Sequence, residues 1–189
     1  QRSSEDPLFT IRTENALRIL AYLRTPESVE LLVSMNSPSK VADGGRRLVA
    51  AGLVPLAVES VPQSGLNSRV LTGLAREISN NLLDETDWLA TLEDLRAMNA
   101  IALNPGMSDQ NRTEVRSMQF KAYDNLADRI KASDQPDELV LSIHRAMLGL
   151  RARLLDNATA GDVSNRQIAG TLRGMLVKIA EATVKQWSG

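Results

Sequence analysis

The side chains that most often carry out acid–base or nucleophilic chemistry are scarce in this sequence. The 189 residues include one histidine, His144, and no cysteine. A histidine that acts as a general base or metal ligand needs a carboxylate or a second ligand to orient it. No Asp, Glu or second His stands three or four residues from His144. Thiolate chemistry, disulfides and thiolate-bound metals are excluded. We expect no cofactor and no metal, and we interpret His144 as a structural residue.

Two short motifs have parts of known reactive or anion-binding sites. Ser37-Pro38-Ser39-Lys40 has the Ser-x-x-Lys spacing of a lysine-activated nucleophile, but its companion Ser-Asp-Asn and Lys-Thr-Gly motifs are missing. A helix cap is the favoured interpretation. Gly44-Gly45-Arg46-Arg47 brings glycines and guanidinium groups together, as phosphate sites at helix starts do, but it lacks the P-loop spacing. We expect these glycines to let helices approach and the arginines to reach solvent.

Asp124 and Asp128 stand four residues apart and therefore share a helical face, where two carboxylates can hold a divalent cation. No second acidic motif completes a set of ligands, and Lys121 and Arg129 are placed to offset the charge. A solvated helix face is the favoured interpretation.

Charge is unevenly distributed although the formal net charge is −1. Residues 77–137 carry 12 acids and 6 bases, whereas residues 138–189 carry 4 acids and 7 bases. Complementary charges select protein partners. We therefore expect a partner-binding surface that contains Asp84, Glu85, Asp87, Glu93, Asp94, Arg46 and Arg47. No nucleic-acid-binding groove is expected, because the pI is near 5.9 and aromatic residues make up 3% of the chain.

Apolar spacing and capping residues predict helices throughout the first half of the chain. Thr25-Pro26 and Ser37-Pro38 each place a hydroxyl before a proline, which is typical of a helix start. We expect one helix after Thr13, a second from Pro26, a third over 38–51 ended by Gly52, and a fourth opened by Val54-Pro55 that reaches about Val61. A fifth begins at Asn67, and Asp84 or Thr86 caps a sixth.

Longer helices are predicted beyond the turn at Asn104-Pro105-Gly106, over about 108–132, 136–157 and 164–187. Ser164 to Gln167 form a capping box for the last of these helices. Gly149, Gly170 and Gly174 predict a close helix crossing, because a glycine inside a helix is unfavourable unless another backbone passes nearby.

The predicted fold class is therefore all-α, with short, solenoid-like helical pairs packed on a bundle of three longer antiparallel helices. We divide the chain into an N-terminal extension (1–12), a short-helix region (13–104) and a three-helix region (105–189), the last two packed together as one domain.

One part of the first half is similar to helical repeat proteins. Ala51-Gly52-Leu53-Val54-Pro55-Leu56-Ala57-Val58, followed by Ser68 to Ala75, resembles an armadillo-type unit. Ala16 to Leu23, with Pro26 and Leu31-Leu32 after it, is similar to a HEAT-type helical pair. The resemblance covers about residues 13–83. It implies a surface that binds a partner rather than a catalytic site, and it transfers no functional residues.

The expected function is a protein–protein interaction or scaffold module without catalytic activity, whose partner is another protein. The alternative is a small-molecule-binding or regulatory helical domain with a pocket between the two halves, lined by Trp88, Arg116, Phe120 and Tyr123. No apolar run approaches the length of a transmembrane helix. The lack of cysteine favours an exported or periplasmic location over a cytoplasmic one.

Overall fold

The computed structural model describes residues 7–59, 65–132 and 140–146, together with residues 148, 169–170, 173–178, 180–181 and 184. In these ranges the regular secondary structure is helical and contains no strand, so the predicted all-α class is confirmed. The helices are α1 (Pro7–Leu23), α2 (Pro26–Met35), α3 (Gly44–Val58), α4 (Ser68–Asp84), α5 (Trp88–Leu103) and α6 (Asp109–Ala132). None of these described helices is both long and apolar enough to span a bilayer.

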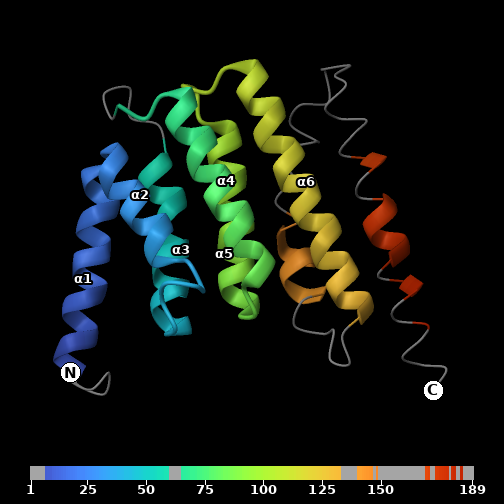
Figure 1. The fold of residues 1–189 in the computed structure, drawn as a ribbon, viewed down its shortest axis with the longest axis horizontal. Helices are drawn as coiled ribbons and strands as arrows, with labels where there is room; N and C mark the ends of the chain where they lie inside the picture. Colours follow the sequence, from blue (N-terminus) through green and yellow to red (C-terminus); the bar gives the residue numbers. More distant parts are fainter. Residues whose placement is uncertain are drawn as a thin grey trace.

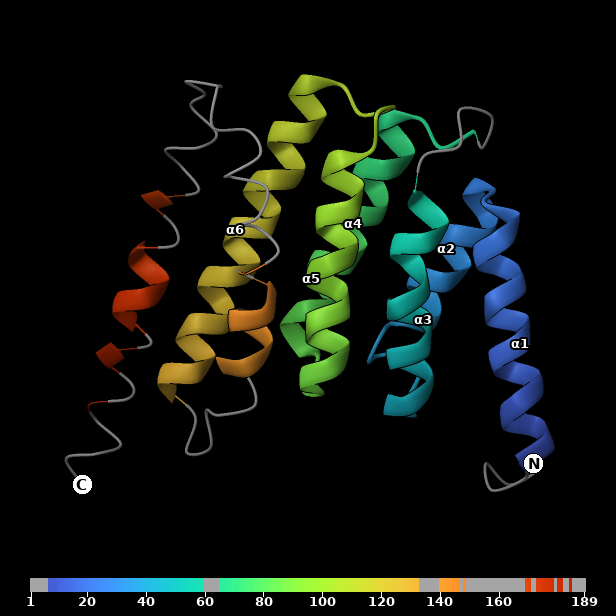
Figure 2. The same cartoon turned by 180° about the vertical axis from the view of Figure 1, so that it is seen from behind.

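The six helices lie in two layers (Figures 1 and 2). Helices α1, α3 and α5 pack side by side in one layer, and α2, α4 and α6 form the other. Helix α1 also packs on α2, and α5 packs on both α4 and α6, so the apolar faces of the layers meet. Residues 140–146 lie beside α6, and residues 173–178 lie on its outer side. The armadillo- and HEAT-type resemblance remains a prediction.

The core fills the space between the layers. Its largest fully buried apolar side chains come from α2, α4, α5, α6 and the two later helical segments: Leu32, Leu71, Ile78, Leu95, Met98, Ile101, Tyr123, Leu126, Ile130, Ile143 and Met175. Burial of this apolar surface is the main stabilising contribution to the fold.

Several helix starts agree with the local sequence. Thr25 caps α2 in a capping box with Ser28, and Pro26 occupies the first helical position. Asn67 caps α4 by accepting from two backbone amides. For α5 the prediction was wrong: neither Asp84 nor Thr86 is the cap. Asp87 caps this helix, and its carboxylate accepts from the amides of Leu89 and Ala90.

The predicted third and fourth helices are one helix. Ser37-Pro38 does not begin it; α3 starts at Gly44, capped by Asp43, and runs through Gly52 and Pro55 to Val58. One buried face continues across both residues, because Ala50, Ala51, Val54, Ala57 and Val58 are all inaccessible to solvent. Packing of this face outweighs the helix-breaking tendency of glycine and proline.

The N-terminal part of the chain also differs from the prediction. Helix α1 begins at Pro7, so the expected N-terminal extension of residues 1–12 includes the first turns of a helix. The helix predicted over 108–132 is confirmed as α6. Much of the last two predicted helices, the Ser164 capping box and Gly149 lie outside the described residues. Gly170 and Gly174 are exposed, and a Cβ at either would meet no atom of the described residues within 4 Å, so no close backbone approach is seen at these two glycines in that part of the chain.

Candidate functional site

The acidic residues predicted to share a surface are separated by burial. Glu85 and Asp94 are fully buried, with exposed fractions of 0%. Asp84 is exposed, whereas Asp87 and Glu93 are half-buried. Asp87 serves as the cap of α5, and Glu93 forms an ion pair with Arg96 one helical turn away at 2.8 Å. The five carboxylates therefore do not form one accessible acidic surface, because two of them lie in the interior.

Glu85 is buried because Arg47 neutralises it. The Arg47 Nε donates to Glu85 Oε2 at 2.7 Å, and Nη2 donates to Oε1 at 2.9 Å. The remaining terminal nitrogen of Arg47 donates to the backbone carbonyls of Val41 and Ala42. Glu85 Oε1 also accepts from the amides of Thr86 and Asp87. This pair connects the start of α3 to the loop between α4 and α5, so its role is structural.

Asp94 is buried opposite Asn36, whose amide nitrogen donates to Asp94 Oδ1. The second oxygen, Oδ2, and the amide oxygen of Asn36 have no hydrogen-bond partner in the part of the chain that the structure describes. Burial raises the pKa of Asp94 well above its ordinary value, and the nearby carboxylates of Glu85 and Glu93 act in the same direction. Asp94 is therefore inaccessible to a partner.

Arg46 is not a free surface cation either. It forms an ion pair with Asp43 at 3.3 Å, and its guanidinium lies over the Phe9 ring, 4.9 Å from the ring centroid. The contact with Phe9 connects α3 to α1.

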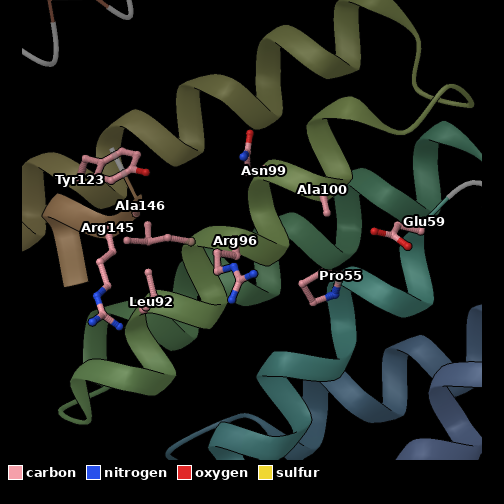
Figure 3. Close-up of a pocket in the computed structure, with 10 residues that line it drawn as sticks. Pro55, Glu59, Leu92, Arg96, Asn99, Ala100, Tyr123, Arg145 and Ala146 are labelled. Carbon is pink, nitrogen blue, oxygen red and sulfur yellow. The ribbon is translucent and has the colours of Figure 1, made fainter. Parts of the chain in front are cut away.

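A cleft of about 490 Å³ lies where the two halves of the chain meet. Pro55 and Glu59 come from α3 and its end, whereas Tyr123 lies on α6. The remaining lining residues belong to α5 and to the segment 140–146: Leu92, Leu95, Arg96, Asn99, Ala100, Arg145 and Ala146. Figure 3 shows that the lining extends from Tyr123 and Arg145 at one end to Pro55 and Glu59 at the other, with Arg96 between them.

The two arginines of the cleft each contact a neighbouring side chain. The Arg96 side chain is 62% exposed and is paired with Glu93 through Nη1. The Arg145 guanidinium lies over Trp88, 6.0 Å from the ring centroid, and its side chain is exposed. Two guanidinium groups therefore have donors that can reach a ligand, because an arginine carries five N–H groups. Glu59, at the opposite end, is exposed.

Tyr123 and Asn99 complete the wall of the cleft. Burial raises the pKa of Tyr123 above its ordinary value, which is already above physiological pH, so its phenol is neutral. The amide oxygen of Asn99 is buried and accepts no hydrogen bond from the described residues. Among the side chains predicted to line a pocket between the halves, Tyr123 does so. Trp88 instead supports Arg145, Phe120 is buried in the core, and Arg116 is outside the lining.

The remaining candidate motifs are not arranged for chemistry. Lys40 donates to Ser34 and to Glu77, while the Ser37 hydroxyl lies 3.0 Å from that of Ser39. Lys178 lies between Asp124 and Asp128, at 3.4 and 3.0 Å, and this cation was not anticipated from the sequence. His144 is exposed. No group of three potential metal-ligating residues occurs within the described part of the chain.

Sequence reasoning missed Arg96, Asn99 and Glu59 as cleft residues. Arg145 was noticed only as part of the basic excess in residues 138–189. Arg96 and Asn99 are three residues apart on α5, which is the spacing of neighbours on one helical face. That spacing was a signal, but it is common on any helix surface.

Comparison with family models, with curated proteins and with solved structures found no match to the chain. The functional assignment therefore depends on the geometry of the cleft.

Proposed function

We propose that the chain is a protein-binding module that holds an extended segment of another protein in the cleft between α3, α5, α6 and residues 140–146. The observation that carries this proposal is the elongated cleft, which has Arg145 at one end, Arg96 in the middle and the Glu59 carboxylate at the other end. A peptide can follow such a groove along its length. The apolar residues that α5 contributes to the lining are Leu92, Leu95 and Ala100. They accept apolar side chains of the partner.

The charges favour a partner segment of defined polarity. Arg96 and Arg145 attract an acidic side chain of the partner, and guanidinium groups bind carboxylates with two parallel hydrogen bonds. Glu59 favours a basic or neutral residue at the other end. The proposed surface therefore recognises an acidic residue next to apolar ones, and it replaces the acidic surface expected from the sequence.

A random peptide display library, selected against the immobilised full chain, tests this proposal. The wild-type chain should enrich peptides that share an acidic residue beside apolar residues, and Arg96→Ala/Arg145→Ala should lose them. The matched control is Arg69→Ala/Arg173→Ala, which removes two exposed arginines outside the cleft. Equal enrichment by all three proteins, or peptides without a shared acidic residue, would contradict the proposal.

A second candidate function is small-molecule binding in the same cleft. Its volume of about 490 Å³ is within the range of ligand pockets, and Asn99 offers an amide oxygen without a partner among the described residues. A metabolite that binds the native state raises the melting temperature. A thermal-shift screen should then find compounds that stabilise the wild-type chain but not Arg96→Ala/Arg145→Ala.

A further inference from the structure

Helix α1 has apolar side chains on two opposite faces. On the inner face, Leu17 and Ala21 are buried against the rest of the fold. The outer face carries four large exposed side chains, which are 54–69% accessible: Leu8, Ile11, Ile19 and Tyr22. We call this outer face the α1 stripe. An apolar stripe of this kind on a monomeric soluble protein marks a surface that another molecule covers.

The α1 stripe lies at one edge of the described fold. Helix α1 packs on α2 and α3 with its inner face, and no helix lies beyond it in Figures 1 and 2. No residue of α1 lines the cleft, so the stripe and the cleft are separate surfaces.

The spacing of the stripe is symmetric about Asn15, which is also exposed. Ile11 and Ile19 stand four residues before and after Asn15, and Leu8 and Tyr22 stand seven residues before and after it. Steps of four and seven residues keep side chains on one face of a helix. The stripe therefore has the same pattern when it is followed in either direction.

We infer that the α1 stripe is the interface between two copies of this chain, paired antiparallel about a two-fold axis at Asn15. A two-fold interface uses the same surface on both copies, so it must be self-complementary. In this arrangement Ile11 of one copy meets Ile19 of the other, and Leu8 meets Tyr22. The two Asn15 side chains meet at the axis, where a polar residue fixes the register of paired helices.

The available area fits this occupant. The exposed parts of the stripe, together with Leu23 on the same helix, offer roughly 500 Å² of apolar surface, which is below the about 800 Å² that each partner buries in a standard interface and fits a weak dimer. The aliphatic parts of Arg12 and Arg18 extend the surface on either side.

The charged residues beside the stripe are also compatible with self-pairing. Arg18 and Glu14 lie on the same flank of α1, given 3.6 residues per turn. An antiparallel two-fold pair brings this flank of one copy against the same flank of the other. Arg18 of each copy then lies near Glu14 of the other, which gives two symmetric attractive contacts.

Sedimentation velocity on the full chain tests the oligomeric state. The wild-type chain should form a dimer with a dissociation constant in the micromolar range, and Ile11→Glu/Ile19→Glu should be a monomer at the same concentration. The matched control, Leu83→Glu/Leu176→Glu, changes two leucines that are 53% and 57% exposed on other helices, and it should remain a dimer. A monomeric wild type, a dimeric α1 variant or a monomeric control would each overturn the inference.

Cysteine cross-linking tests the register, because the chain has no cysteine of its own. Asn15→Cys should form a disulfide-linked dimer under mild oxidation, since its two copies meet at the axis. Leu8→Cys should not cross-link, because antiparallel pairing separates the two copies of this position by about 20 Å. A Leu8→Cys dimer, or no Asn15→Cys dimer, would overturn the antiparallel register. Peptide selection by the cleft is a separate readout, so failure of either proposal leaves the other testable.

Discussion

Arg47 on α3 and Glu85 in the loop after α4 form a two-point ion pair in the protein interior, with donor–acceptor distances of 2.7 and 2.9 Å. Glu85 is also connected to α6, because the Arg129 guanidinium donates to the backbone carbonyl of Glu85 at 2.7 Å and to that of Leu82 at 3.2 Å. Glu85 therefore connects to α3 through its carboxylate and to α6 through its backbone carbonyl.

Removal of the arginine should strongly destabilise the fold. Arg47→Met leaves the Glu85 carboxylate buried without its cation, which costs about 3–5 kcal/mol of the free energy of unfolding. Chemical denaturation followed by circular dichroism measures this change. Lys40→Met, which breaks the exposed pair with Glu77, is the control and should cost less than about 1 kcal/mol. Adding Glu85→Gln to Arg47→Met should recover part of the loss; a further loss would contradict this account of the pair.

The cap of α5 gives a second prediction. Asp87→Ala removes the acceptor for the Leu89 and Ala90 amides and should lower the free energy of unfolding by about 1 kcal/mol. Asp84→Ala changes an exposed carboxylate that does not cap the helix, so its effect should be smaller. Denaturation curves of the two variants distinguish the caps. An equal loss from both variants would argue against Asp87 as the cap.

The buried Asp94 predicts an unusual dependence of stability on pH. Its folded-state pKa lies well above the value of about 3.9 in an unfolded chain. As pH rises from about 4, the unfolded chain loses this proton while the native chain retains it, so the contribution of Asp94 to stability falls until the folded-state pKa is passed.

Asp94→Asn should therefore be more stable than the wild type at pH 8. The introduced amide keeps an acceptor for Asn36 and adds a donor, but it has no proton to lose. Its advantage should shrink toward pH 4, by up to about 1.4 kcal/mol per pH unit across the interval. Thermal unfolding from pH 4 to 8 measures the difference, with exposed Asp84→Asn as the control. A difference that is independent of pH would contradict the raised pKa of Asp94.

Local signals predicted the all-α class and several helix boundaries. Thr25-Pro26 and Asn67 act within their own first turns, so the starts of α2 and α4 were readable. The continuity of α3 through Gly52 and Pro55 was not, because packing against other helices decides it. The burial of Glu85 and Asp94 was also hidden, since their partners Arg47 and Asn36 are 38 and 58 residues away.

The cleft could be anticipated only in part. A pocket between the two halves was one of the interpretations of the sequence, and Tyr123 was among the residues proposed for it. Arg96, Asn99 and Arg145 belong to it because α5 and residues 140–146 come together in space, and one sequence contains no signal for that approach. Helix α1 is a second example of what the sequence does not show. Apolar residues lie on two of its faces, and the sequence pattern does not indicate which of the two faces is buried.

The most direct test of the proposed function is an NMR titration of the full ¹⁵N-labelled chain with a peptide selected by the cleft. Amide resonances of Arg96, Asn99 and Arg145 should shift with peptide concentration, those of Arg69 and Arg173 should not, and Arg96→Ala/Arg145→Ala should weaken the binding at least tenfold. Shifts confined to other helices, or unchanged affinity of the double variant, would contradict peptide binding in the cleft.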